Sequence, residues 1–247
     1  MPSQIIEPAT FDPRYKTLYR LGGIASIVIA FSIALAIAAF FIWPYKGSNT
    51  SIEAIFTLLQ TDRLGGLISL DISMLLIAPI NILMFLAIYA ALRRVDESIA
   101  LIALVLALIA VVLVIVCRPL VELTVLSDHY AAATDPTEKL RYLAAGEILR
   151  TSLDGTAWMM QTVFFLLAGL INCLLMLRTT FFSKATAWLG IVISVIGLPF
   201  FLPGAIGLLF LFLNTIGSVP WCLLLARDLL RMAGEGQTAL GYSRREA

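Results

Sequence analysis

The chain has 247 residues, of which 60% are hydrophobic and only 13% are charged. A soluble domain carries about a quarter charged residues, so this composition excludes an ordinary soluble fold and predicts that much of the surface faces lipid. A net charge of +1 excludes the basic footprint of a nucleic-acid-binding protein. One histidine and three scattered cysteines predict neither a metal site nor a disulfide framework, and no cofactor is expected.

Six apolar runs are long enough to cross a membrane, for which about 20 helical residues are needed. They are predicted at residues 21–43, 64–92, 99–126, 154–177, 185–202 and 204–232. Backbone polar groups in lipid must be satisfied within the segment, and the runs lack the alternation of barrel strands, so the spans should be helices. The sequence therefore predicts an all-α, polytopic six-helix domain over residues 21–232, with cytoplasmic tails at 1–20 and 233–247.

Two connections between these runs have the pattern of short amphipathic helices. The segment Thr50-Ser51-Ile52-Glu53 reads as a capping box, with Thr50 as the N-cap. Asp135 is the expected N-cap of a second helix, since Pro136 follows it and Glu138 stands three residues on. This second helix either ends before the span at 154–177 or runs unbroken into it. Both helices are predicted to lie on the outer surface of the membrane.

Basic residues are distributed unevenly between the two sides of this arrangement. With the N-terminus in the cytoplasm, eleven Lys and Arg residues fall inside and six fall outside. Because cytoplasmic loops carry an excess of these residues, both termini are predicted to be cytoplasmic. The expected location is a plasma (inner) membrane.

Three segments together resemble one known family. They are Leu70-Asp71 with the run Leu86-Ala87-Ile88-Tyr89-Ala90-Ala91-Leu92-Arg93-Arg94-Val95, the run Ser98-Ile99-Ala100-Leu101-Ile102-Ala103, and Pro220-Trp221 with Ala226-Arg227. In these segments the chain is similar to the bacterial multi-pass membrane proteins of the domain of unknown function 4386 family. The resemblance extends from the first predicted span to the last. It implies a helical bundle in a bacterial membrane, and it implies no activity and no catalytic residue.

Ionisable side chains inside a membrane are costly, so they are candidates for function. Asp71 stands seven residues into the second predicted span, about 10 Å below its outer end. Arg118, at the outer end of the third span, is its natural partner, and Glu122 lies one helical turn beyond Arg118 on the same face. The alternative is a structural ion pair that only fixes the helix register.

The fourth predicted span carries a polar stripe. At 100° per residue, its members fall within about 20° of one direction; they are Glu147, Asp154, Gln161 and Asn172. Lipid cannot face such a stripe, so we expect it to point into the bundle. It would form either a wet groove or a set of interhelical hydrogen bonds.

These features predict a polar cavity that opens to the outside. Its expected lining is Asp71, Arg118, Glu122 and Asp154, continued toward mid-membrane by Gln161, Asn81 and Asn214. Such a cavity would bind or transport a small polar solute or a lipid headgroup. Two alternatives stay open: a membrane-embedded enzyme that uses Asp71 or Asp154 as general acid or base, and a non-catalytic structural or accessory protein.

Overall fold

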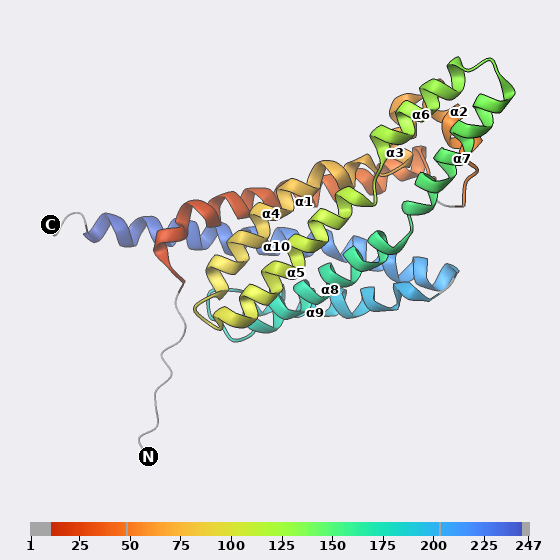
Figure 1. The fold of residues 1–247 in the computed structure, drawn as a ribbon. Coiled ribbons are helices and arrows are strands. Elements are labelled where there is room, and N and C mark those ends of the chain that lie inside the picture. Colours follow the sequence, from red (N-terminus) through yellow and green to blue (C-terminus); the bar gives the residue numbers. More distant parts are fainter. Residues whose placement is uncertain (1–10, 48, 203, 244–247) are drawn as a thin grey trace. The chain divides into compact units, whose positions relative to one another are not determined.

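The computed structural model describes residues 11–47, 49–202 and 204–243, with side chains as far as Glu235 (Figure 1). In this part of the chain every regular element is a helix, and six helical segments are long and apolar enough to cross a membrane. They are Pro13–Ile42, Ile72–Leu92, Glu97–Ala132, Pro136–Met176, Lys184–Phe201 and Ala205–Glu235. The predicted all-α, polytopic fold with six spans is therefore confirmed.

The long apolar helices are α1 (Lys16–Ile42), α4 (Ile72–Leu92), α5 (Glu97–Val116), α8 (Thr156–Met176), α9 (Lys184–Gly197) and α10 (Ala205–Ser243). The 3₁₀ turn η1 (Pro13–Tyr15) precedes α1, and η2 (Leu198–Phe201) follows α9. Helix thus extends into both segments that were predicted as tails. Residues 1–10 and 244–247 of those tails lie outside the described part of the chain.

Two of the predicted helical stretches are broken, and each break produces a short extra helix. The stretch at 64–92 divides at Leu70-Asp71 into α3 (Arg63–Ser69) and α4. The stretch at 99–126 divides at Cys117–Pro119 into α5 and α6 (Leu120–Ala132), because Pro119 lacks an N–H and disfavours helical backbone in the residue before it. The option of one unbroken helix from Asp135 is wrong, since α7 (Pro136–Ser152) ends before α8 begins.

The lengths that the breaks leave are close to the thickness of a bilayer. α4, α5 and α8 have 21, 20 and 21 residues. At 1.5 Å per residue each is about 30 Å long, the thickness of the hydrocarbon core. The breaks at the start of α4, the end of α5 and the start of α8 therefore fall at one edge of that core, and we expect the short helices beyond them to lie outside it.

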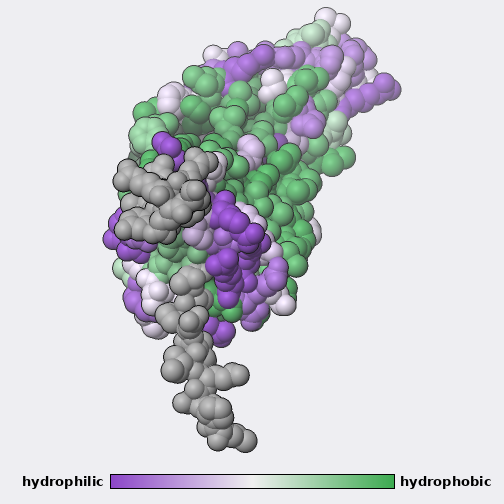
Figure 2. Space-filling model, turned by 90° about the vertical axis from the view of Figure 1, so that its left-hand side faces the viewer, coloured by the Kyte–Doolittle hydropathy of each residue, from purple (hydrophilic) through white to green (hydrophobic). Residues whose placement is uncertain are grey.

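Large apolar side chains are exposed along the long helices. On α1, Phe31, Phe41 and Ile42 expose 70%, 81% and 70% of their surface. Figure 2 shows hydrophobic residues over much of the visible face. A soluble protein of this size does not leave so many large apolar groups in water, whereas lipid accommodates them.

The chain forms two compact units. The first comprises residues 1–31, 80–108 and 164–247, and the second comprises residues 32–79 and 109–163. In the second unit, α2 (Ile52–Thr61), α3, α6 and α7 pack together (Figure 1), and we call these four helices the cap. Their shared core consists of Ile52, Ile55, Phe56, Leu59, Leu70, Leu120, Leu123 and Leu153.

The amphipathic helices predicted at the surface belong to this cap. The apolar side of α2, formed by Ile52, Ile55, Phe56 and Leu59, is buried. Asp135 caps α7 by accepting from the N–H of Thr137. The predicted N-cap of α2 is wrong by one residue. It is Ser51 whose hydroxyl accepts from Ala54 N at 3.3 Å, whereas Thr50 precedes the cap.

In the first unit, α1 packs closely on α4 and α10. A Cβ at Gly22 would stand 2.2 Å from Ala87 Cβ, and one at Gly23 would stand 2.7 Å from Leu230 Cγ. Two buried aspartates fasten this unit. Asp12 forms ion pairs with three arginines, and Asp228 on α10 accepts from the Thr186 hydroxyl of α9 at 2.6 Å.

Candidate functional site

Arg118 stands in the break between α5 and α6, and its guanidinium joins two breaks of the second unit. Its side chain is 1% exposed. Nη1 donates to the carbonyl oxygen of Leu153, in the α7–α8 break, at 2.8 Å and to that of Cys117 at 3.2 Å. The guanidinium also lies over the Trp158 ring, 4.6 Å from its centroid. Carbonyls freed by broken helices and an aromatic face thus hold a buried cation.

Asp71 occupies the third break, between α3 and α4, and the predicted ion pair with Arg118 is present. Asp71 Oδ2 lies 3.5 Å from Arg118 Nη2, and Oδ1 accepts from the Ser73 hydroxyl at 2.7 Å. The backbone of Asp71 has φ 64°, in the left-handed region. Such a conformation costs about 1–3 kcal/mol in most residues and is found preferentially at functional sites. Aspartate tolerates it better than most side chains.

The ion pair is loose, and it leaves one edge of the guanidinium without a strong acceptor. A charge-assisted N–H···O bond is usually about 2.7–2.9 Å long. Among the described residues, Nη2 has only Asp71 at 3.5 Å and the Met74 sulfur at 3.8 Å. Nε has no acceptor among the described residues. Nε and Nη2 form the edge of arginine that matches the two oxygens of a carboxylate or phosphate.

Asp154 lies beside this cluster, in the break between α7 and α8. Its Oδ1 accepts from the Tyr45 hydroxyl at 3.0 Å. Burial is the main cause that raises the pKa of Tyr45, so the phenol is neutral and can donate at ordinary pH. The chain passes so close here that a Cβ on Gly47 would stand 2.6 Å from Asp154 Oδ2. Tyr45 thus ties the segment after α1 to the same site.

Gln161 follows Trp158 by about one turn of α8 and is buried, as the stripe predicted. Its Nε2 donates to the Thr162 hydroxyl at 2.7 Å, and its Oε1 has no donor among the described residues. Among its described residues, the second unit therefore holds two buried side chains with unused hydrogen-bonding capacity, Arg118 and Gln161.

Glu122 does not belong to the site. It is exposed on α6. The prediction that it shares a face with Arg118 assumed one continuous helix, and the break at Pro119 ends that periodicity.

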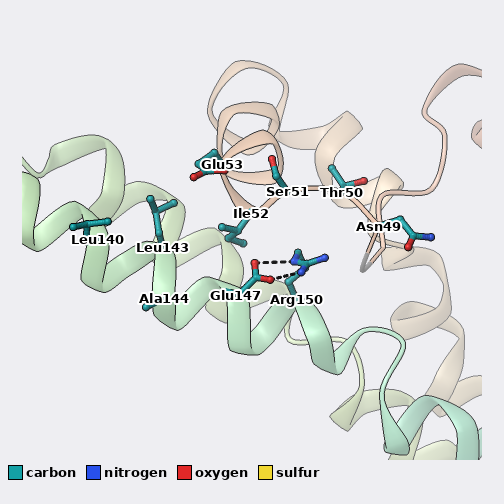
Figure 3. Close-up of a pocket in the computed structure, with 10 residues that line it drawn as sticks. All are labelled: Asn49, Thr50, Ser51, Ile52, Glu53, Leu140, Leu143, Ala144, Glu147 and Arg150. Carbon is teal, nitrogen blue, oxygen red and sulfur yellow. Dashed lines mark hydrogen bonds and ion pairs between the residues drawn. The ribbon is translucent and has the colours of Figure 1, made fainter.

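Glu147 is likewise separated from the stripe, by the break before α8. It pairs with Arg150 of its own helix and lines a groove of about 610 Å³ between the start of α2 and α7 (Figure 3). The groove is lined by Asn49, Thr50, Ser51, Ile52, Glu53, Leu140, Leu143, Ala144, Glu147 and Arg150. Figure 3 shows the Arg150 guanidinium turned toward Glu147.

Asn81 and Asn214, predicted to continue the lining, are part of the first unit. Asn214 Nδ2 donates to the carbonyl oxygen of Ile193 on α9 at 2.8 Å. Asn172, the last member of the stripe, is buried in the same unit. Of the seven predicted site residues, three therefore gather at the breaks, and they are Asp71, Arg118 and Asp154.

Two residues of the site were missed from sequence. Trp158 follows Asp154 by four residues, a spacing that places both on one helical face, so it could have been found. Tyr45 lies in the connection after α1, and nothing in its local pattern links it to a residue more than 100 positions away.

Within the described part of the chain, no group of three or more His, Cys, Asp and Glu side chains comes together as a metal site. Comparisons with protein-family models, curated proteins and solved structures found no match to this chain. The resemblance noted in the sequence therefore stays an expectation.

Proposed function

We propose that this chain is a bacterial plasma-membrane protein that binds a small polar solute or a lipid headgroup at Asp71, Arg118 and Asp154. The observation that carries the proposal is the buried Arg118 guanidinium, whose counter-ion is 3.5 Å away and whose Nε has no acceptor among the described residues. A purely structural ion pair is expected to be close and fully hydrogen-bonded, because an under-paired buried charge destabilises the fold.

The position of the site supports the same proposal. In membrane proteins that bind polar ligands, interrupted helices often mark the binding site. Three interruptions meet here, at Asp71, Arg118 and Asp154. The excess of basic residues at the other ends of the same helices supports cytoplasmic termini, so the site would face the outside. Membership of the family resembled in sequence is part of this proposal.

The test is thermal unfolding of the purified protein in detergent with a panel of probes. The panel contains inorganic phosphate, acetate, glycine, choline and two short-chain lipids, dioctanoyl phosphatidylglycerol and dioctanoyl phosphatidylethanolamine. A ligand that binds only the folded state raises the unfolding temperature. We expect at least one probe to do so for the wild type and for Glu122→Gln, the exposed control, but much less for Asp154→Asn and Arg118→Lys.

Two outcomes contradict the proposal. One is a wild-type protein that no probe stabilises. The other is stabilisation that is equal in all four proteins, which would place binding elsewhere and leave the Arg118 cluster a structural junction.

A further inference from the structure

We infer that the ligand is an oxyanion, a carboxylate or a phosphate group, that replaces Asp71 on the Nε–Nη2 edge of Arg118 while Asp71 takes up a proton. This inference rests on the proposed function and adds to it the chemical class of the ligand and a coupled ion.

The N–H groups of Arg118 that lack a strong acceptor define the shape of the ligand that would bind there. Nη1 is used by two backbone carbonyls, which fix the guanidinium from one side. The remaining edge presents Nε–H and an Nη2–H in parallel. Two oxygens on one central atom, as in a carboxylate or phosphate, receive both N–H groups at once. Neutral carbonyl ligands offer one oxygen and would leave Nε as it is.

Asp71 cannot satisfy this edge from its present position. Its Oδ1 is held by the Ser73 hydroxyl at 2.7 Å, so only Oδ2 faces Arg118. The left-handed backbone fixes where the side chain begins. The Asp71 side chain is 17% exposed, whereas that of Arg118 is 1% exposed, so the aspartate is the outer member of the pair. An anion that arrives from solvent therefore meets Asp71 first and reaches Arg118 by displacing it.

The net charge of the site favours the uptake of a proton when the anion binds. The groups that act electrostatically on this site are Arg118, Asp71, Asp154, Tyr45 and the Cys117 thiol. Arg150 also acts on Asp154, and its charge is balanced by its ion pair with Glu147. With both carboxylates ionised the site carries one net negative charge, and an entering monoanion would make it two. At low dielectric constant such a charge is costly, and protonation of one carboxyl group removes it.

Asp71 is the carboxyl group that gains the proton. Asp154 keeps the Tyr45 hydroxyl as a donor throughout, whereas Asp71 loses its cationic partner when the anion arrives. Burial, the largest influence, already raises the pKa of Asp71, with Arg118 opposing it. The balance is simple: one monoanion and one proton enter from solvent, the proton forms an O–H bond on Asp71, and no bond of the ligand breaks.

The experiment measures anion binding and proton uptake together. Wild-type protein in detergent is titrated calorimetrically with acetate, inorganic phosphate and dioctanoyl phosphatidic acid, in two buffers of different ionisation enthalpy. We expect uptake of about one proton per anion, and an affinity that falls with rising pH toward a limit of tenfold per pH unit. Binding of acetate indicates a carboxylate ligand, binding of inorganic phosphate indicates a soluble phosphate, and binding of the lipid alone indicates a lipid headgroup.

Three variants separate the roles of the residues. Asp71→Asn imitates the protonated aspartate, so it should bind the same anion at least as tightly as the wild type, without proton uptake and without pH dependence. Arg118→Lys lacks the bidentate edge and should bind about tenfold or more weakly. Glu122→Gln should behave as the wild type. The wild-type buffer comparison needs no variant, so it decides the question even if one of them fails to fold.

The possible failures are distinguishable. If the anion binds wild type with no proton uptake, or if folded Asp71→Asn does not bind it, the exchange at Asp71 is refuted. If choline binds and the three anions do not, the ligand class is wrong while the proposed function stands. If none of the probes binds, both are refuted.

Discussion

Asp12 concentrates charge at one end of the first unit. It is 1% exposed and lies 2.9, 3.2 and 3.0 Å from the guanidinium nitrogens of Arg14, Arg93 and Arg94. The hydrogen bonds from Arg14 hold the pKa of this carboxyl group well below its usual range. A lowered pKa stabilises the fold above the unfolded-state value, about pH 4, and that stabilisation is lost as the pH falls through the folded-state value.

For Asp12→Asn we therefore expect a lower unfolding temperature at pH 7 and a shallower decline below about pH 4 than in the wild type. The measurement is thermal unfolding in detergent from pH 7 to pH 2, with Glu122→Gln as control. A variant that keeps the wild-type pH profile of the unfolding temperature would show that the ion pairs of Asp12 with the three arginines do not stabilise the fold.

Gly47 tests the Tyr45–Asp154 contact at the scale of one methyl group. A Cβ there would lie 2.4 Å from Tyr45 Cε1 and 2.6 Å from Asp154 Oδ2, distances that real Cβ atoms do not show. Gly47→Ala should separate the two side chains and destabilise the protein by about 1–3 kcal/mol. Gly234→Ala is the matched control, because a Cβ at that helical position meets nothing within 4 Å. Equal unfolding midpoints for the two variants would contradict the close approach.

Among the helices, the start of α2 gives two neighbouring hydroxyl residues, Thr50 and Ser51, different roles. Ser51 caps the helix, although the residue pattern favoured Thr50. Loss of an N-cap hydroxyl usually costs about 0.5–2 kcal/mol. Ser51→Ala should therefore destabilise the cap by about 1 kcal/mol and Thr50→Ala by much less, as measured by denaturant unfolding in detergent. The reverse order would restore the prediction made from the sequence.

The helices show what a sequence can and cannot predict about its elements. All six spans were predictable because their apolar runs are long and their composition leaves few alternatives. The break at Pro119 had a local signal, the proline itself, but the apolar residues on either side of it favoured the prediction of one continuous helix. The break at Asp71 had none, since a left-handed aspartate depends on Ser73 and Arg118 around it. Errors in the site followed from errors in the elements: Glu122 was misplaced only because the third helix was taken as continuous.

At the scale of the whole molecule, the arrangement across the membrane is open to a direct test. In a background without Cys117, Cys173 and Cys222, single cysteines are placed at Thr134 and Ser98, which are both exposed. With cytoplasmic termini, a membrane-impermeant thiol reagent added to intact cells should label position 134 and not position 98. Labelling of position 98 alone would invert the topology and turn the Arg118 site toward the cytoplasm.

Part of the site could be predicted because of the composition of the whole chain. Asp71 and Arg118 were paired correctly because charge is rare in this chain and each has few possible partners. Asn81 and Asn214 were assigned to the same cavity on the assumption that all inward polar groups share one interior. Both asparagines belong to the other of the two compact units, so their place in this lining stays a prediction.

The nearly equal lengths of α4, α5 and α8 limit the membranes that suit this protein. A helix whose apolar run continues past the interface can tolerate a thicker bilayer by drawing in a further turn. These three cannot, because Asp71 directly precedes α4, Arg118 stands two residues after α5 and Asp154 stands two residues before α8. A bilayer with longer acyl chains must therefore thin around the protein, at a cost of fractions of a kcal/mol per Å. The charged residues that form the site therefore also restrict the protein to bilayers whose hydrocarbon core is about 30 Å thick.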